Sequence, residues 1–187
     1  PMDNSNTTRD EFRYQQRGYA KYGDIARLFG WEALKKFFYQ ENLDFNSGTL
    51  TCFESPICRD GLSHVDSRIL RLSKAAAADL TPLIHFWGVH PDNSTALAQA
   101  ITAAGLDNST IVRDKLVYYA GIAPDNNTEF NAHFETVFPG RPTDCASPHY
   151  GCGWYNVWTD NFTESHADNI TSTIQSLLTK YFPGTNL

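Results

Sequence analysis

Apolar residues in the stretch 25–39 recur in steps of three and four, which is the spacing of residues on one face of a helix. The basic residues of this stretch fall on the opposite face. Gly30 interrupts the pattern, and glycine lowers helix propensity by about 1 kcal/mol relative to alanine. The pattern therefore predicts one helix over about 9–29 and a second over about 31–44, packed through an aromatic core.

Four further apolar segments each begin near a residue whose side-chain oxygen can cap a helix N-terminus. The expected caps are Ser63, Thr81, either Asn93 or Ser94, and either Ser109 or Thr110. Gly88 and Gly105 are the expected stops of the second and third of these helices. The residues expected to share one core are Leu28, Phe29, Trp31, Leu34, Phe37, Leu72, Leu83, Phe86 and Trp87. The first two thirds of the chain are thus predicted to be helical.

The pattern changes after residue 120. Prolines and glycines are scattered through 121–153 without a sustained period, which predicts loops and one short helix near 129–137. A final helix is expected over 164–181. Between them, three aromatic residues alternate with other side chains, so this stretch could be a short strand or a cover for the core. The same rings could line a sugar-binding surface; they are Trp154, Tyr155 and Trp158.

Length and composition indicate one domain. A chain of 187 residues with 41% hydrophobic and 13% aromatic residues can bury a sizeable core. We expect a mainly α, compact domain with long disulfide-pinned loops and an irregular, aromatic-rich C-terminal third. Its expected parts are a helical core over 9–120, a loop-rich segment over 121–160, and a C-terminal helix and tail over 161–187.

Charge and hydropathy restrict the kinds of partner. The formal net charge is -6 and the chain has no run of basic residues, which argues against nucleic acid and against an anionic membrane surface. No stretch approaches the ~20 consecutive apolar residues of a membrane span. The polar start over 1–10 is not a signal peptide, so we expect a secreted form to be a mature or trimmed product.

The cysteines indicate an oxidising compartment. They form two close pairs in loop-like contexts, Cys52 with Cys58 and Cys145 with Cys152. A zinc site is the competing interpretation, but the C-x2-C spacing of common structural zinc sites is absent. Three pairings are formally open, and the two local disulfides are the pairing that the short loops favour.

The glycosylation acceptor pattern N-x-[ST] is dense in this chain. It occurs at Asn6, Asn93, Asn108, Asn126, Asn161 and Asn169. Together with paired cysteines, such a density predicts an extracellular or cell-surface glycoprotein. Each asparagine that carries sugar must then face solvent.

Three short signatures follow one another in the first half of the chain. They are Leu28-Phe29-Gly30-Trp31-Glu32-Ala33-Leu34-Lys35-Lys36-Phe37-Phe38, Leu70-Arg71-Leu72-Ser73-Lys74-Ala75 and Asp79-Leu80-Thr81-Pro82-Leu83-Ile84-His85-Phe86-Trp87-Gly88. In this order they resemble the later half of enhancin-type, mucin-degrading zinc metallopeptidases. In that family an F-G-W helix is followed by a helix reading roughly L-S-x-A and by a segment like N-L-x-P-F-F-x-x-W-G. The resemblance covers about 19–91, under half of the chain.

The zinc-binding part of that family is missing from this sequence. The family carries zinc on an H-E-x-x-H helix that precedes the F-G-W helix, and this chain contains no such motif. The resemblance therefore implies zinc only in a full-length parent, and no cofactor in this chain. His85 and His90 are the nearest local pair, but they lie five residues apart across Gly88 and do not share a helix face as i, i+4 ligands do. We interpret each as a packed or surface histidine. The remaining histidines also lack neighbours that would suggest a set of metal ligands; they are His64, His133, His149 and His166.

Other catalytic patterns are also absent. The sequence has no G-x-S-x-G, no G-x-x-x-x-G-K-[ST] and no G-x-G-x-x-G opening a helix. The carboxylate pairs Asp10/Glu11 and Glu41/Asp44 are expected on solvated faces. No catalytic residue is assigned from the sequence.

Two functions remain as hypotheses. The resemblance implies a non-catalytic helical portion of a secreted, glycosylated metallopeptidase-like protein that acts on or binds glycoproteins. Its partner would be the N-terminal catalytic part of the same protein, and this chain alone would be inactive. The alternative is an extracellular structural or binding glycoprotein, such as a matrix, surface or filament component, that keeps the scaffold without catalysis and contacts other extracellular chains.

Overall fold

The computed structural model describes residues 15–48, 57–137, 163–185 and 187, which form helices joined by short links. The helices are α1 (Gln15–Phe29), α2 (Trp31–Asn46), α3 (His64–Ala76), α4 (Thr81–Phe86), α5 (Ser94–Ala103), α6 (Thr110–Ile122), α7 (Asn127–Val137) and α9 (Glu164–Tyr181). The described residues contain no strand, only two isolated bridges. The predicted mainly α fold is confirmed for this part of the chain.

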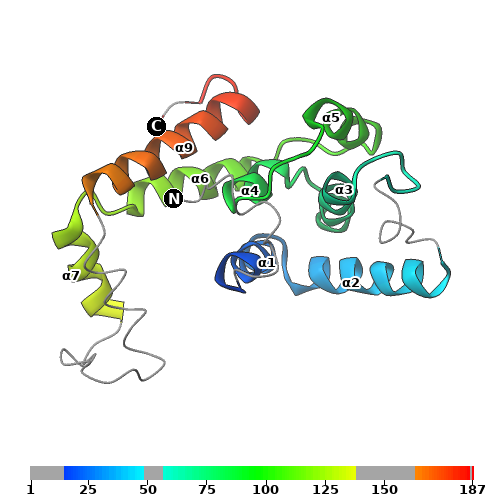
Figure 1. The fold of residues 1–187 in the computed structure, drawn as a ribbon, viewed down its shortest axis with the longest axis horizontal. Coiled ribbons are helices and arrows are strands. Elements are labelled where there is room, and N and C mark those ends of the chain that lie inside the picture. The colour runs from blue at the N-terminus through cyan, green and yellow to red at the C-terminus, as the bar shows by residue number, and fades with distance from the viewer. Residues whose placement is uncertain (1–14, 49–56, 138–162, 186) are drawn as a thin grey trace.

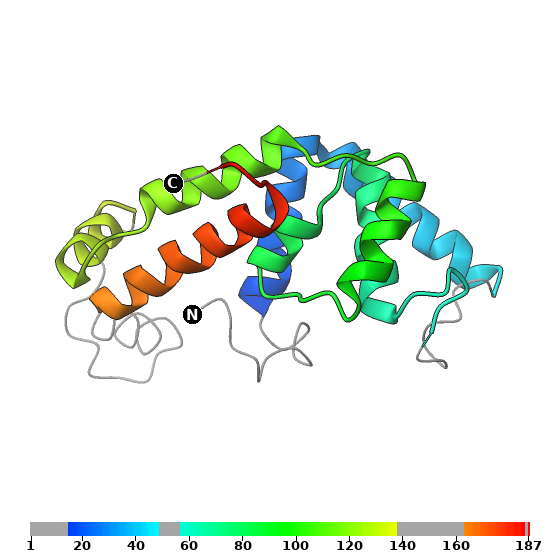
Figure 2. The ribbon, with the colours of Figure 1, turned by 90° about the horizontal axis from the view of Figure 1, so that it is seen from above.

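The short helix α4 lies where two groups of helices meet. In the first group, α1 packs on α2, α2 on α3, and α3 on α5. In the second, α6 and α9 lie side by side, and α7 lies at the end of this pair that is farther from α2 (Figures 1 and 2). Contacts of α4 with α3, α6 and α9 connect the groups. A residue in or next to α4 can therefore touch several elements that are distant in sequence.

Gly30 separates α1 from α2, as the sequence predicts. Its φ of 81° lies in the left-handed region that only glycine adopts without strain. The carbonyl of Gly30 then accepts the N–H of Ala33 at 3.2 Å, which closes the first turn of α2. The glycine of the F-G-W signature is thus required by the backbone.

Most of the residues expected in the core are buried there. The fully buried ones are Leu34, Phe37, Leu72, Leu83 and Phe86, and the partly buried ones packed against them are Leu28, Phe29 and Trp87. The prediction for Trp31 was wrong, because this side chain is 69% exposed. At about 100° per residue, Trp31 lies roughly 120° around α2 from Phe37, whose face is the buried one.

Two predicted helix starts are confirmed by their capping bonds. Ser63 accepts the backbone N–H of Asp66 at 3.1 Å, and Asn93 accepts the N–H of Ala96 at 3.0 Å. Asn93 rather than its neighbour therefore caps α5. Ser109 occupies the N-cap position of α6. Local sequence chemistry set these boundaries, as expected from N-cap preferences.

The prediction that Thr81 caps α4 was wrong by one position. Thr81 is the first residue of α4, and its backbone N–H donates to Oδ1 of Asp79 at 2.8 Å. Asp79 reaches over Leu80 to take the role of cap, which a short acidic side chain does well. Gly88, with φ of 87°, follows the end of the helix as predicted.

The two helices expected in the C-terminal third are confirmed. The predicted short helix is α7, and the final helix has the predicted bounds of α9. The inward face of α9 contributes Ile174, Leu177 and Leu178 to the common core. The aromatic stretch 154–158 lies outside the described residues.

Candidate functional site

A buried carboxylate on α1 contacts α6 and the residue that follows α4. Asp24 is only 3% exposed. It accepts the indole N–H of Trp87 at 2.8 Å, and the hydroxyl of Tyr119 lies 2.8 and 2.7 Å from its two oxygens. Nζ of Lys115 lies 3.6 Å from Oδ1 of Asp24. Sequence reasoning missed this network because its members come from α1, α6 and the residue after α4.

The Asp24 network is suited to fixing helices. Burial, followed by the hydrogen bond to Asp24, raises the pKa of Tyr119 above its ordinary value, so the phenol stays protonated as a donor. Nζ of Lys115 also lies 4.3 Å from the centroid of the Tyr119 ring. The tryptophan of the W-G signature, Trp87, thereby gains a structural role that its sequence context did not indicate.

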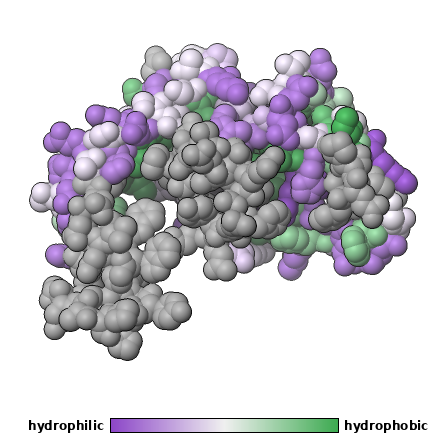
Figure 3. Space-filling model, in the orientation of Figure 1, coloured by the Kyte–Doolittle hydropathy of each residue, from purple (hydrophilic) through white to green (hydrophobic). Residues whose placement is uncertain are grey.

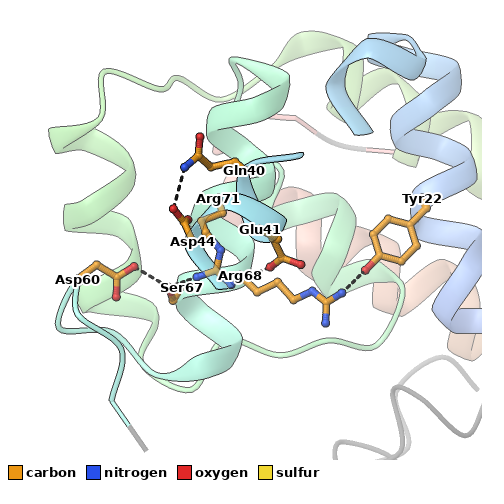
Figure 4. A network of polar contacts seen from close by, with 8 residues as sticks. All are labelled: Tyr22, Gln40, Glu41, Asp44, Asp60, Ser67, Arg68 and Arg71. Atoms are coloured by element: carbon orange, nitrogen blue, oxygen red, sulfur yellow. Dashed lines mark hydrogen bonds and ion pairs between the residues drawn. The ribbon is translucent and has the colours of Figure 1, made fainter. Parts of the chain in front are cut away.

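A second polar network links α2, α3 and the loop before α3 (Figure 4). Arg71 donates to Glu41 at 3.0 Å and to Ser67 at 2.6 Å, and Ser67 donates to Asp60 at 2.6 Å. The Arg71 and Glu41 side chains are 16% and 21% exposed. The prediction that Glu41 lies on a solvated face was therefore wrong, because α3 packs on this turn of α2.

Two flanking contacts extend this network (Figure 4). Nη2 of Arg68 donates to the hydroxyl of Tyr22 at 2.8 Å, which connects α3 to α1. Gln40 donates to Asp44 at 2.8 Å along α2. The ion pair is partly shielded from solvent, and it fixes the register of α2 against α3.

Cys58 is disulfide-bonded and 5% exposed. The other three cysteines, Cys52, Cys145 and Cys152, lie outside the described residues, so the local pairing stays a prediction. Independent bonds also hold this loop. The N–H of Cys58 donates to the carbonyl of Leu62 at 2.7 Å, and Asp60 accepts the N–H of Leu62 at 3.1 Å.

The structure brings His85 and His90 together, which their spacing did not predict. Their ring centroids lie 4.4 Å apart with an edge-to-face angle of 68°. The turn at Gly88 folds the chain back, so the two rings meet without sharing a helix face. Nδ1 of His85 also forms a hydrogen bond of 2.9 Å with the hydroxyl of Tyr181 on α9.

We predict that Tyr181 makes the protein less stable as the pH rises above 10. Burial, followed by the nearby charge of Asp79, raises the pKa of Tyr181 from 10.0 to about 12. The unfolded state loses the phenolic proton at lower pH than the folded state does. The stabilisation is therefore fully present below pH 10.0 and is lost as the pH rises towards about 12. Urea unfolding across this window should show the decline.

The control for this prediction is Tyr181→Phe, which keeps the ring and removes the titrating group. Its stability should fall less steeply with pH than that of the parent. Some decline should remain, because the pKa of Tyr119 is also raised. Identical slopes for the parent and Tyr181→Phe would contradict the assignment.

A cleft of about 370 Å³ lies between α5 and the end of α9. Its apolar wall consists of Leu97, Ile101 and Leu106. Its polar lining includes the residues Asp79, Thr81, Asp107, Asn108, Lys180 and Tyr181. Asp79 is only 8% exposed, and the backbone N–H of Asp79 donates to the carbonyl of Asp107 at 3.0 Å. This cleft, which the described residues line, therefore combines a buried charged group with an apolar wall.

The described sequon asparagines lie where sugar can be attached. Asn93, Asn108 and Asn169 are exposed, and Asn126 is half-buried. Asn93 and Asn126 each use the side-chain oxygen as a helix cap, which leaves the glycosylated nitrogen outside that bond. Nδ2 of Asn108 donates to the carbonyl of Tyr181 at 2.9 Å, and a glycosylated amide still keeps one N–H for this bond. Glycosylation at these four positions stays a prediction.

Several predicted site residues lie outside the described residues. They are the sequon residues Asn6 and Asn161 and the proposed sugar-contacting residues Trp154, Tyr155 and Trp158.

Across residues 15–48, 57–137 and 163–185, no group of three His, Cys, Asp or Glu side chains is placed to hold a metal ion. Within the same ranges, none of the helices has the length and apolar character needed to cross a bilayer.

Comparison with known proteins gave no relative: no family model, no curated protein and no solved structure matches the chain.

Proposed function

We propose that this chain is the non-catalytic helical portion of a secreted, glycosylated metallopeptidase-like protein, and that it binds glycoproteins through an aromatic surface on α2. The observation that carries the proposal is the exposure of Trp31, a signature residue that the fold does not bury. Zinc and its ligands would belong to an N-terminal catalytic part, which is the expected partner of this chain.

The other signature residues support the fold itself. Gly30 provides the left-handed link between α1 and α2. Ser73, from the L-S-x-A signature, accepts the N–H of Leu80 at 3.0 Å and so ties α3 to the start of α4. Trp87 donates to Asp24. Because the three signatures meet in one packed unit, their common occurrence is explained by a shared scaffold, which supports the resemblance.

Trp31 differs from these residues because its ring faces solvent. Phe38 and Phe45 follow it at seven-residue steps, or about 10.5 Å along the helix axis, and they are 49% and 63% exposed. Green, apolar patches in Figure 3 follow the edge along which Figure 1 draws α2. A row of exposed aromatic side chains on a helix is typical of a binding surface. Aromatic rings also stack on the apolar faces of sugars, which supports a glycoprotein as the ligand.

The binding test compares the parent chain with Trp31→Ala. Binding to an immobilised mucin-type glycoprotein, measured by surface plasmon resonance, should weaken at least about 10-fold in this variant, as for a central interface aromatic. Ile111→Ala is the matched control, since Ile111 is 49% exposed on α6. No binding by the parent chain, or equal binding by Trp31→Ala, would overturn the binding surface.

The alternative, an extracellular structural or binding glycoprotein without catalysis, needs a different test. The coding sequence upstream of Pro1 distinguishes the two functions. An H-E-x-x-H segment followed by a further glutamate supports the metallopeptidase parent, and zinc should then copurify with the longer protein. A secretion signal directly before Pro1 supports the alternative.

A further inference from the structure

We propose that the cleft between α5 and the end of α9 binds an organic cation, namely an ammonium or guanidinium group carried on an aliphatic stem. The basic side chain of a polypeptide and a free aliphatic amine share this chemistry. The inference rests on the cleft alone and does not depend on the proposed function, whose surface lies on α2.

The carboxylate of Asp79 is the charge that such a cation would meet. Asp79 is 8% exposed and lines the cleft. Oδ1 is held by the N–H of Thr81 at 2.8 Å, and the described residues provide no hydrogen-bond donor to Oδ2. A buried carboxylate with one oxygen free towards a cleft is incompletely paired, and a charge-assisted hydrogen bond from a ligand would complete it.

The remaining lining favours an organic cation over a bare metal ion. Leu97, Ile101 and Leu106 offer an apolar wall that can cover the methylene groups of a stem. Among the described residues of the lining, the only other carboxylate is that of Asp107. A metal ion held by protein ligands needs more donors than two carboxylates supply, and the described chain groups no three such residues.

An ammonium group from the chain itself already lies at the cleft. Nζ of Lys180 lies 5.0 Å from the centroid of the Tyr181 ring, and both residues line the cleft. The hydroxyl of Tyr181 is fixed by Nδ1 of His85 at 2.9 Å, so the ring is held in place. Lys180 is exposed, so its charge would compete with an external cation without being trapped there. Counted over the described lining residues, two carboxylates and one lysine give the cleft a net negative charge.

The test is a titration of the full chain with Nα-acetyl-lysine amide and Nα-acetyl-arginine amide, followed by amide chemical shifts in NMR. Nα-acetyl-norleucine amide is the neutral control. We expect one of the cationic probes to shift the amides of 79–81 and 106–108, and the neutral probe to leave them in place. Equal shifts with the neutral probe, or no shift with either cation, would overturn the proposal.

Two variants are expected to change the affinity for the cation in opposite directions. Asp79→Asn should weaken binding of the cation at least about 10-fold, while the asparagine oxygen can still accept the N–H of Thr81. Lys180→Met should tighten binding about two- to fivefold, because it removes the competing charge from an exposed position. A merely structural role of the cleft would give no tightening. Unchanged affinity in both variants would refute the assignment.

Two further titrations identify the source of the cation. Tighter binding of a lysine-containing peptide than of 1,4-diaminobutane supports a polypeptide side chain, and the reverse order supports a free amine; either order keeps the proposed chemistry. Calcium chloride that shifts the same amides and displaces the cation would instead assign a metal site and overturn the proposal. Because the α2 variant Trp31→Ala leaves this cleft intact, failure here and failure of glycoprotein binding are separate results.

Discussion

Replacing Asp24 by alanine is expected to lower the free energy of unfolding by about 3–5 kcal/mol. The substitution removes the acceptor for Trp87 and Tyr119 and the charge that balances Lys115. A buried donor left without an acceptor costs about 1–3 kcal/mol, and an unpaired buried ammonium costs more. Urea unfolding followed by circular dichroism measures the loss, because the network joins α1, α6 and the residue after α4 in one cooperative unit.

Asp24→Asn is the matched control. Asparagine has nearly the same shape and keeps one acceptor oxygen, so it can satisfy one of the two donors but not the charge of Lys115. We expect the free energy of unfolding of Asp24→Asn to lie between that of the parent and that of Asp24→Ala. A loss below about 1 kcal/mol for Asp24→Ala would contradict a stabilising role for the network.

Local chemistry made the helices predictable. Helix ends depend on residues that lie next to them in sequence, such as Gly30 with its positive φ and Ser63 with its capping hydroxyl. The periodic burial of α9 is equally local, since its inward residues recur in steps of three and four. Where the prediction for α4 was one position off, the aspartate two residues before the threonine was the signal that was overlooked.

The polar networks could not be predicted, because their members are distant in sequence. Asp24 bonds Trp87 at a separation of 63 residues and Tyr119 at a separation of 95 residues. Neither periodicity nor propensity states which polar residue of one helix faces which residue of another. A weak signal existed, since Asp24 directly precedes Ile25 and lies four residues before Leu28, both on the predicted apolar face, where a charged residue needs partners.

The cleft and the histidine contact were hidden for the same reason. Asp79 and Tyr181 lie about a hundred positions apart, and only the packing of α9 on α4 brings them to one cleft. His85 and His90 are close in sequence, yet a helical spacing rule does not apply to them because the chain turns at Gly88. Sequence reasoning therefore found the scaffold of the candidate site and missed the side chains that line it.

The error at Trp31 shows that a hydrophobic pattern alone does not decide which side chains are buried. Among the aromatic residues of α2, Phe37 is buried and the others are exposed, because only one face of this helix touches α1 and α3. Phe37 is 1% exposed, whereas Trp31 is 69% exposed, although both occur in the same apolar stretch. A single sequence does not reveal which side of such a helix is covered by its neighbours.

Phe37→Ala is expected to destabilise the fold by about 3–5 kcal/mol, the usual cost of removing a buried phenylalanine ring. The ring contacts Phe38 at a centroid distance of 5.1 Å, and the guanidinium of Arg68 lies 5.9 Å from its centroid. Its loss leaves a cavity between α2 and α3, and the surrounding helices are too closely packed to fill it. Thermal and urea unfolding should both report the loss.

Trp31→Ala is the matched control on the same helix. Although tryptophan is the larger side chain, its removal should change the free energy of unfolding by no more than about 0.5 kcal/mol, because the ring is mostly in solvent. The ratio of the two effects tests the placement of α2 more sharply than either value. A loss at Trp31 equal to that at Phe37 would mean that the aromatic face of α2 is buried, and it would remove the basis for a binding surface there.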